Sequence, residues 1–87
     1  MASFEVSVKQ SVARDLRRIP KKDVARILRR IESLAREPRP PGVEKLSGQE
    51  KYRIRQGVYR IIYEIKDEEL VVVIVKVGHR RDVYQGS

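Results

Sequence analysis

An eight-residue segment, Leu70–Val77, constrains the fold of this 87-residue chain more than any other feature. Every position except Lys76 is apolar, so both pleats of a strand formed here would be hydrophobic. This pattern is typical of an interior strand that is covered on both faces for much of its length. The segment is far too short to span a bilayer, which takes about 20 apolar residues in a helix. We therefore expect a sheet built around this strand, and no membrane partner.

Three other segments alternate apolar and polar residues and predict the remaining strands. Residues 52–55 and 59–65 alternate on either side of Gln56-Gly57, a turn signal, and residues 67–69 form a second turn before the interior strand. Residues 3–8 alternate as well. Because one side of the interior strand is taken by its hairpin partner, we expect this first strand on the other side.

Two helices are predicted between the first strand and the hairpin. Apolar residues recur at helical spacing from Val12 to Ile19, with Ser11 as the candidate N-cap and Pro20 as the stop. Asp23 opens a second helix, and residues 38–42, rich in proline, end it. One apolar stripe on this helix contains Val24, Ile27, Leu28, Ile31, Leu34 and Ala35. The prediction is a single α+β domain over residues 1–87, β-α-α-β-β-β, with an α-hairpin on one face of a four-stranded, mainly antiparallel sheet.

Composition narrows the classes of function. The net charge of +8 favours a polyanionic partner, nucleic acid above all, although a thermophile's charged surface is an alternative. Without cysteine there is neither a disulfide nor a thiolate zinc site, and one histidine cannot build a histidine-rich metal site. Carboxylates near the predicted arginine patch, Glu50, Glu64 and Asp82, are too few for a two-metal nuclease. We expect no metal or cofactor, and, without a signal-like segment at Met1–Val8, a cytoplasmic protein.

The hairpin predicts a row of arginines. If Gln56-Gly57 forms the turn, Arg53 lies directly opposite Arg60, and both share with Arg55 the face that the helices leave open. Like charges in opposed positions destabilise a sheet, whereas a phosphate bound between them would relieve the repulsion. The alternative is a solvated outer face with Glu64 as its counter-ion. One carboxylate among three arginines makes that account the weaker one.

The C-terminal segment adds further candidates beyond the interior strand. Arg80 and Arg81 could reach the same patch, and Tyr84 could stack on an unpaired base or bond to a phosphate. His79 has the side chain whose ordinary pKa suits proton transfer near neutral pH, although a lone histidine is more often an ordinary surface residue.

Four segments together resemble the RelE/ParE toxin superfamily: Lys45-Leu46-Ser47-Gly48, Tyr52-Arg53-Ile54-Arg55, Tyr59-Arg60-Ile61-Ile62-Tyr63 and Val77-Gly78-His79-Arg80-Arg81-Asp82-Val83-Tyr84. The resemblance runs over nearly the whole chain. It implies the RelE-like fold of a type II toxin that cuts mRNA in the ribosomal A site. In that reaction the 2′-hydroxyl attacks the adjacent phosphate without a metal, which leaves a cyclic phosphate.

The resemblance also assigns roles to residues. Arg60 matches the arginine that holds the scissile phosphate, Arg80 the tail arginine and Tyr84 the tail tyrosine, while Arg53 and Arg55 stand where the best-known branch carries lysines. Arginine keeps its proton in proteins, so the base would be His79, a solvent or ribosomal group, or none, with catalysis by positioning and charge alone.

The superfamily further implies partners and competing functions. The partners are a RelB-like antitoxin, mRNA and the rRNA around the A site. A ParE-like inhibitor of DNA gyrase without enzymatic activity is the second hypothesis, and an RNA-binding relative without activity of its own is the third.

Overall fold

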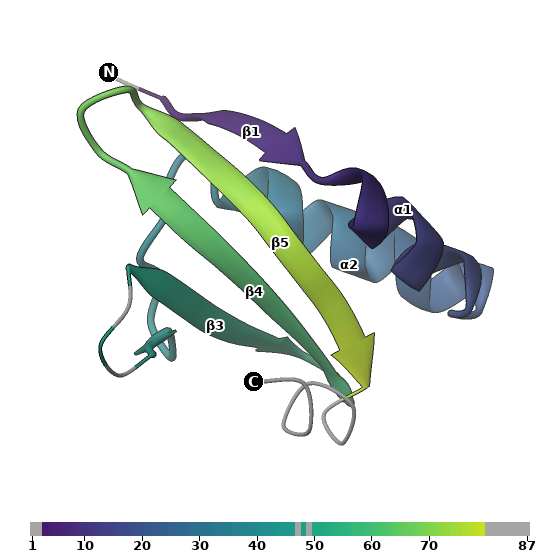
Figure 1. Cartoon of the computed structure of the whole chain (residues 1–87). Helices are drawn as coiled ribbons and strands as arrows, with labels where there is room; N and C mark the ends of the chain where they lie inside the picture. Colours follow the sequence, from purple (N-terminus) through teal and green to yellow (C-terminus); the bar gives the residue numbers. More distant parts are fainter. Residues whose placement is uncertain (1–2, 47, 49, 80–87) are drawn as a thin grey trace.

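The computed structural model describes residues 3–46, 48 and 50–79. Two helices lie across one face of a five-stranded mixed sheet, whose strands follow the order β1-β5-β4-β3-β2 (Figure 1). In chain order the elements are β1 (Glu5–Val8), α1 (Gln10–Arg17), α2 (Lys21–Ser33), β2 (Glu44–Lys45), β3 (Lys51–Gln56), β4 (Tyr59–Lys66) and β5 (Val71–His79). The expected α+β fold is confirmed. The sheet has one strand more than expected, the two-residue β2 at its edge.

β5 is an interior strand, as its apolar run predicts. It pairs in parallel with β1 and antiparallel with β4. On the face toward the helices Val72, Ile74 and Val77 are buried, whereas Val71 and Val73 on the other face are half-buried. The prediction that β5 is covered on both faces for much of its length is therefore only partly right, because both helices lie on the same side of the sheet (Figure 1).

The core lies between the helices and the sheet. α1 contributes Val12, while α2 and the residue after it contribute Ile27, Ile31 and Leu34. Leu28 is 41% exposed, contrary to its place in the predicted stripe, because it lies about 100° around the helix from the buried Ile27. The strands complete the core with Tyr52, Ile54, Ile61, Tyr63, Ile65, Val72, Ile74 and Val77.

The predicted cap of the first helix is wrong. α1 begins at Gln10, so Ser11 lies inside the helix, and the capping position is occupied by Lys9, whose side chain makes no capping bond. The backbone N–H of Lys9 donates to the carbonyl of Ile74, at 3.1 Å, and so continues the pairing of β1 with β5. The chain passes from strand to helix without a polar turn.

The β3–β4 hairpin turns one residue later than predicted. Gly57 and Val58 form the two-residue loop, and Gln56 pairs with Tyr59. Gly57 has φ +62°, the left-handed conformation that glycine adopts without strain. The shift places Arg55 opposite Arg60 and Arg53 opposite Ile62, so the predicted pairing of Arg53 with Arg60 is wrong. Within the described residues, no helix is long and apolar enough to cross a membrane.

Candidate nucleic-acid interface

Three arginines project from the face of the sheet that the helices leave open. Arg53 and Arg55 are two residues apart on β3, and therefore on the same side of the strand. Arg60 of β4 is the cross-strand partner of Arg55, so it shares that side. The prediction that these three residues share the open face is confirmed, with Arg55 and Arg60 as the opposed pair.

The three arginines differ in exposure. The side chain of Arg55 is 65% exposed, whereas Arg60 is only 5% exposed and is the one buried charged residue in the described part of the chain. The side chain of Arg60 is therefore almost entirely enclosed, whereas that of Arg55 reaches the solvent. A guanidinium stays charged at all physiological pH values, and its planar fork matches two phosphate oxygens. The pair therefore offers one buried and one exposed guanidinium group.

A carboxylate that the sequence reasoning missed lies among these arginines. Glu44 of β2 is the cross-strand partner of Arg53, and Nη2 of Arg53 donates to Glu44 Oε2 at 2.9 Å. Nη2 of Arg55 is 4.0 Å from Glu44 Oε1. The hydrogen bond and charge of Arg53, then the charges of Arg55 and Arg60, lower the pKa of Glu44. The weaker, alternative account named Glu64 as the counter-ion of the arginines, whereas the structure places Glu44 beside them. Glu44 lies in a strand of two residues, too short for any periodicity to reveal.

The basic face extends onto β5 through Lys76. Ile62 pairs with Arg53 on one side and with Lys76 on the other, so the three side chains form one line across β3, β4 and β5. A register shift between Ile62 and Tyr63 directly follows this line along β4. In the sequence Lys76 is only a break in an apolar run; its place beside the arginines follows from the register alone.

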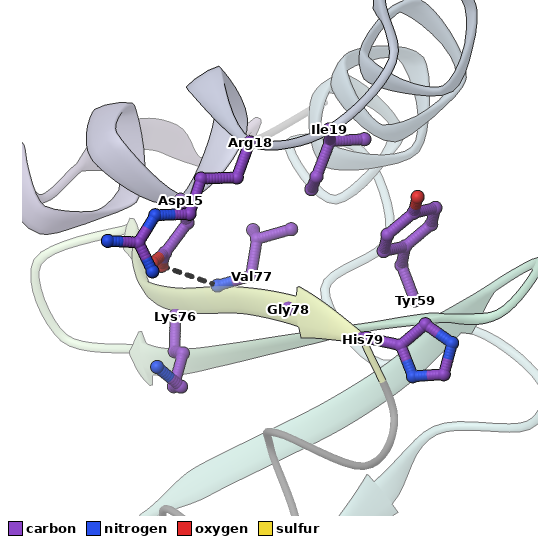
Figure 2. A pocket seen from close by; sticks show the side chains of 8 residues that line it. All are labelled: Asp15, Arg18, Ile19, Tyr59, Lys76, Val77, Gly78 and His79. Carbon is purple, nitrogen blue, oxygen red and sulfur yellow. Dashed lines mark hydrogen bonds between the residues drawn. The ribbon is translucent and has the colours of Figure 1, made fainter.

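His79 lies on the opposite, helix-covered face. Its cross-strand partner is Tyr59, and the two rings meet edge to face with their centroids 6.2 Å apart. Both line a hollow of about 300 Å³ at the end of α1, together with Asp15 and Arg18 (Figure 2). Asp15 Oδ2 accepts a hydrogen bond from the Val77 N–H at 3.3 Å, beyond the point where β1 ends. The structure therefore separates His79 from the arginines with which it was grouped.

The family model described as the ParE toxin of type II toxin–antitoxin systems matches residues 6–84, almost the entire chain. The chain belongs to the RelE/ParE toxin superfamily. It is thus a RelE-like toxin of a type II toxin–antitoxin system.

Individual relatives are similar to this chain over most of its length. Toxin RelG of Mycobacterium tuberculosis is 34% identical over 94% of this chain and 97% of its own length. The toxin–antitoxin complex RelBE2 of the same organism contains a chain that superposes with a TM-score of 0.80 at 31% identity, over 90% of this chain and 99% of that one. A chain of the archaeal RelE–RelB complex of Pyrococcus horikoshii superposes with a TM-score of 0.81 at 32% identity. The match covers 90% of this chain and 96% of that one.

The remaining candidate residues of the toxin, Arg80, Arg81 and Tyr84, lie outside the described residues, so their roles stay predictions. Residues 3–46, 48 and 50–79 contain no group of three or more His, Cys, Asp or Glu side chains arranged to hold a metal ion. What these residues do offer is a set of cations on the sheet face that the helices leave open. Such a set can bind a phosphodiester and stabilise additional negative charge on it.

Proposed function

We propose that this toxin is a ribosome-dependent mRNA endonuclease that cuts in the A site and so inhibits translation. The observation that carries the proposal is the shared open face of Arg53, Arg55 and Arg60, with Arg55 and Arg60 opposed across the hairpin. In the reaction the 2′-hydroxyl attacks the neighbouring phosphate, and the chain breaks to leave a cyclic phosphate and a 5′-hydroxyl. Translating ribosomes place this activity in the cytoplasm.

The residues take different parts in this proposal. Arg60 holds the scissile phosphate and stabilises the extra charge of the pentavalent transition state. Arg53 and Arg55 bind the flanking backbone. From the resemblance, Arg80 adds a further charge, Arg81 contacts RNA and Tyr84 orients the base. His79 has no part in the assignment, because it lies on the helix-covered face.

Primer extension on translated mRNA tests the proposal. Expression of the wild-type chain should give cuts at fixed positions within codons, and Arg60→Ala should abolish them by removing the phosphate-binding group. Arg29→Ala, which removes an equal charge from the exposed surface of α2, is the matched control and should cut normally. Arrested growth with intact message would contradict the nuclease proposal.

An antitoxin partner is part of the same proposal. The related chains from M. tuberculosis and P. horikoshii are described in toxin–antitoxin and RelE–RelB complexes. We infer a RelB-like partner for this chain, and the net charge of +8 favours one with an acidic surface. Co-expression with the product of an adjacent small gene should restore growth.

A second candidate follows from the ParE description of the matching family model. A ParE-like toxin would inhibit DNA gyrase without cutting RNA. A supercoiling assay with purified gyrase separates the two, because a ribosome-dependent nuclease leaves supercoiling unchanged. Inhibition of gyrase by both the wild type and Arg60→Ala would favour this second function.

A further inference from the structure

The three arginines on the open face of the sheet can bind a phosphodiester, but none of them can accept a proton. Attack by a 2′-hydroxyl is accelerated when a nearby group removes its proton. Arg53, Arg55 and Arg60 cannot do this, because a guanidinium does not lose its proton in proteins and has no free lone pair. The carboxylate of Glu44 is the acceptor group that the structure places among them.

We propose that Glu44 is the general base of the cleavage reaction, an inference that rests on the nuclease function proposed above. Its carboxylate takes the proton of the attacking 2′-hydroxyl. The 2′ oxygen then forms a bond to phosphorus, the bond from phosphorus to the 5′ oxygen breaks, and the departing 5′ oxygen takes up a proton from water. Glu44 returns its proton to the solvent, so the overall reaction consumes no other reagent.

The position of Glu44 suits this role. Its side chain is 47% exposed on the open face, so an incoming strand can reach the carboxylate. The bond from Arg53 Nη2 at 2.9 Å fixes one carboxylate oxygen, while the other lies 4.0 Å from Arg55. The charge of Arg60, to which we assign the scissile phosphate, also acts on Glu44. The ribose next to that phosphate would therefore lie near the carboxylate.

Substrate binding should also raise the proton affinity of Glu44. In the free protein Arg53 and its neighbours lower the pKa of Glu44, which keeps the carboxylate ionised and ready to accept a proton. A bound phosphodiester shares the positive charge of these arginines and excludes water from the carboxylate. Both effects raise its proton affinity when the substrate is in place.

The rival account is that Glu44 is only a counter-ion that competes with phosphate for the arginines. The two accounts predict opposite effects of Glu44→Gln, which keeps the shape and an acceptor oxygen for Arg53. If Glu44 is the base, RNA should bind at least as tightly, since a negative charge is gone, while the single-turnover cleavage rate falls about 100-fold or more. If Glu44 only competes, both binding and cleavage should improve.

The experiment measures single-turnover cleavage on ribosomes with a defined A-site codon, and RNA binding in parallel. Glu64→Gln removes another carboxylate from the same sheet face, opposite Lys51, and should cleave as fast as the wild type. Glu44→Asp, with a shorter but ionised side chain, should retain part of the rate. Matching thermal unfolding of Glu44→Gln and the wild type excludes a folding defect.

The pH profile gives a readout that a structural role would not move. The charged groups facing Glu44 are Arg53 and Arg55 from β3 and Arg60 from β4, none of which titrates in the measurable range. The wild-type rate should therefore fall at acidic pH as Glu44 gains a proton, and this limb should vanish in Glu44→Gln. An unchanged or faster rate in Glu44→Gln, or an unchanged acid limb, overturns the proposal and leaves the nuclease function standing. A wild type that leaves message uncut overturns the nuclease function itself.

Discussion

At the residue scale, Arg39 joins three separate parts of the chain. It donates to both carboxylate oxygens of Asp67, at 3.0 and 2.9 Å, and through two nitrogens to the hydroxyl of Tyr52, at 3.3 and 3.2 Å. Its guanidinium carbon lies 5.2 Å from the centre of the Tyr52 ring, which in turn stacks on Tyr63. These contacts connect the proline-rich segment before β2 to the β4–β5 turn and to β3. They support the edge of the sheet that carries Glu44.

The bond between Arg39 and Asp67 should make stability depend on pH in the acid range. The hydrogen bond from Arg39 lowers the pKa of Asp67 in the folded state. The folded state therefore gains stability above the unfolded pKa of about 4, and this gain is lost as pH falls below it toward the lower folded pKa. Asp67→Asn should be less stable than the wild type at neutral pH, with the difference closing as the pH is lowered.

Urea unfolding of both proteins over a series of pH values measures this difference. Glu68→Gln, which changes the next carboxylate of the same turn, should track the wild type throughout. A constant gap between Asp67→Asn and the wild type from neutral to acidic pH would contradict the ion-pair explanation.

At the scale of elements, the β3–β4 hairpin shows what a sequence pattern determines and what it leaves open. Strict alternation assigns Arg53, Arg55 and Arg60 to one face, because the side-chain period of a strand is two. It does not choose the register, since glycine can occupy either position of a two-residue turn. Here Gly57 takes the first position with φ +62°. The arginines therefore share the predicted face, but Arg55 rather than Arg53 opposes Arg60.

Gly57→Ala should destabilise the protein by about 1–2 kcal/mol, the usual cost of a left-handed conformation in a residue with a Cβ atom. A Cβ at this position would meet no heavy atom within 4 Å, so the loss would come from backbone conformation and not from a clash. Chemical denaturation measures it. Val58→Ala, at the other turn position, where the side chain is 52% exposed, is the control and should change stability little. Equal effects of the two substitutions would contradict the conformational explanation.

At the scale of the whole molecule, the sequence predicts the layers better than it predicts the site. The apolar run of β5 implies an interior strand, and β1 pairs with it on the side away from β4. Glu44 and Lys76 belong to the basic face through pairings between distant segments, β2 with β3 and β4 with β5. No local pattern encodes those pairings. Strand alternation identified the sheet arginines, the resemblance to a family gave them roles, and the register of the strands added the carboxylate beside them.

The distribution of charge leads to a final prediction, on salt dependence. The net charge is +8. The molecule measures 34 × 28 × 25 Å, so charges on its opposite sides are separated by more than the electrostatic screening length, which is about 8 Å at physiological salt. Arginines on the helix side therefore contribute little to RNA bound on the open face. Log affinity falls as log salt rises, and each phosphate contact with single-stranded RNA should make this negative slope steeper by about 0.7. The three sheet arginines together should therefore contribute about 2 to the steepness of the slope.

Fluorescence anisotropy with a short RNA over a salt series measures this slope. Arg55→Ala, which removes the most exposed of these arginines, should make the negative slope shallower by about 0.7, because one contact with phosphate is lost. Arg29→Ala changes the net charge equally but lies on α2, and should leave the slope unchanged. If both substitutions made the slope shallower to the same extent, binding would depend on total charge, and the open face could not be the site that positions the scissile phosphate.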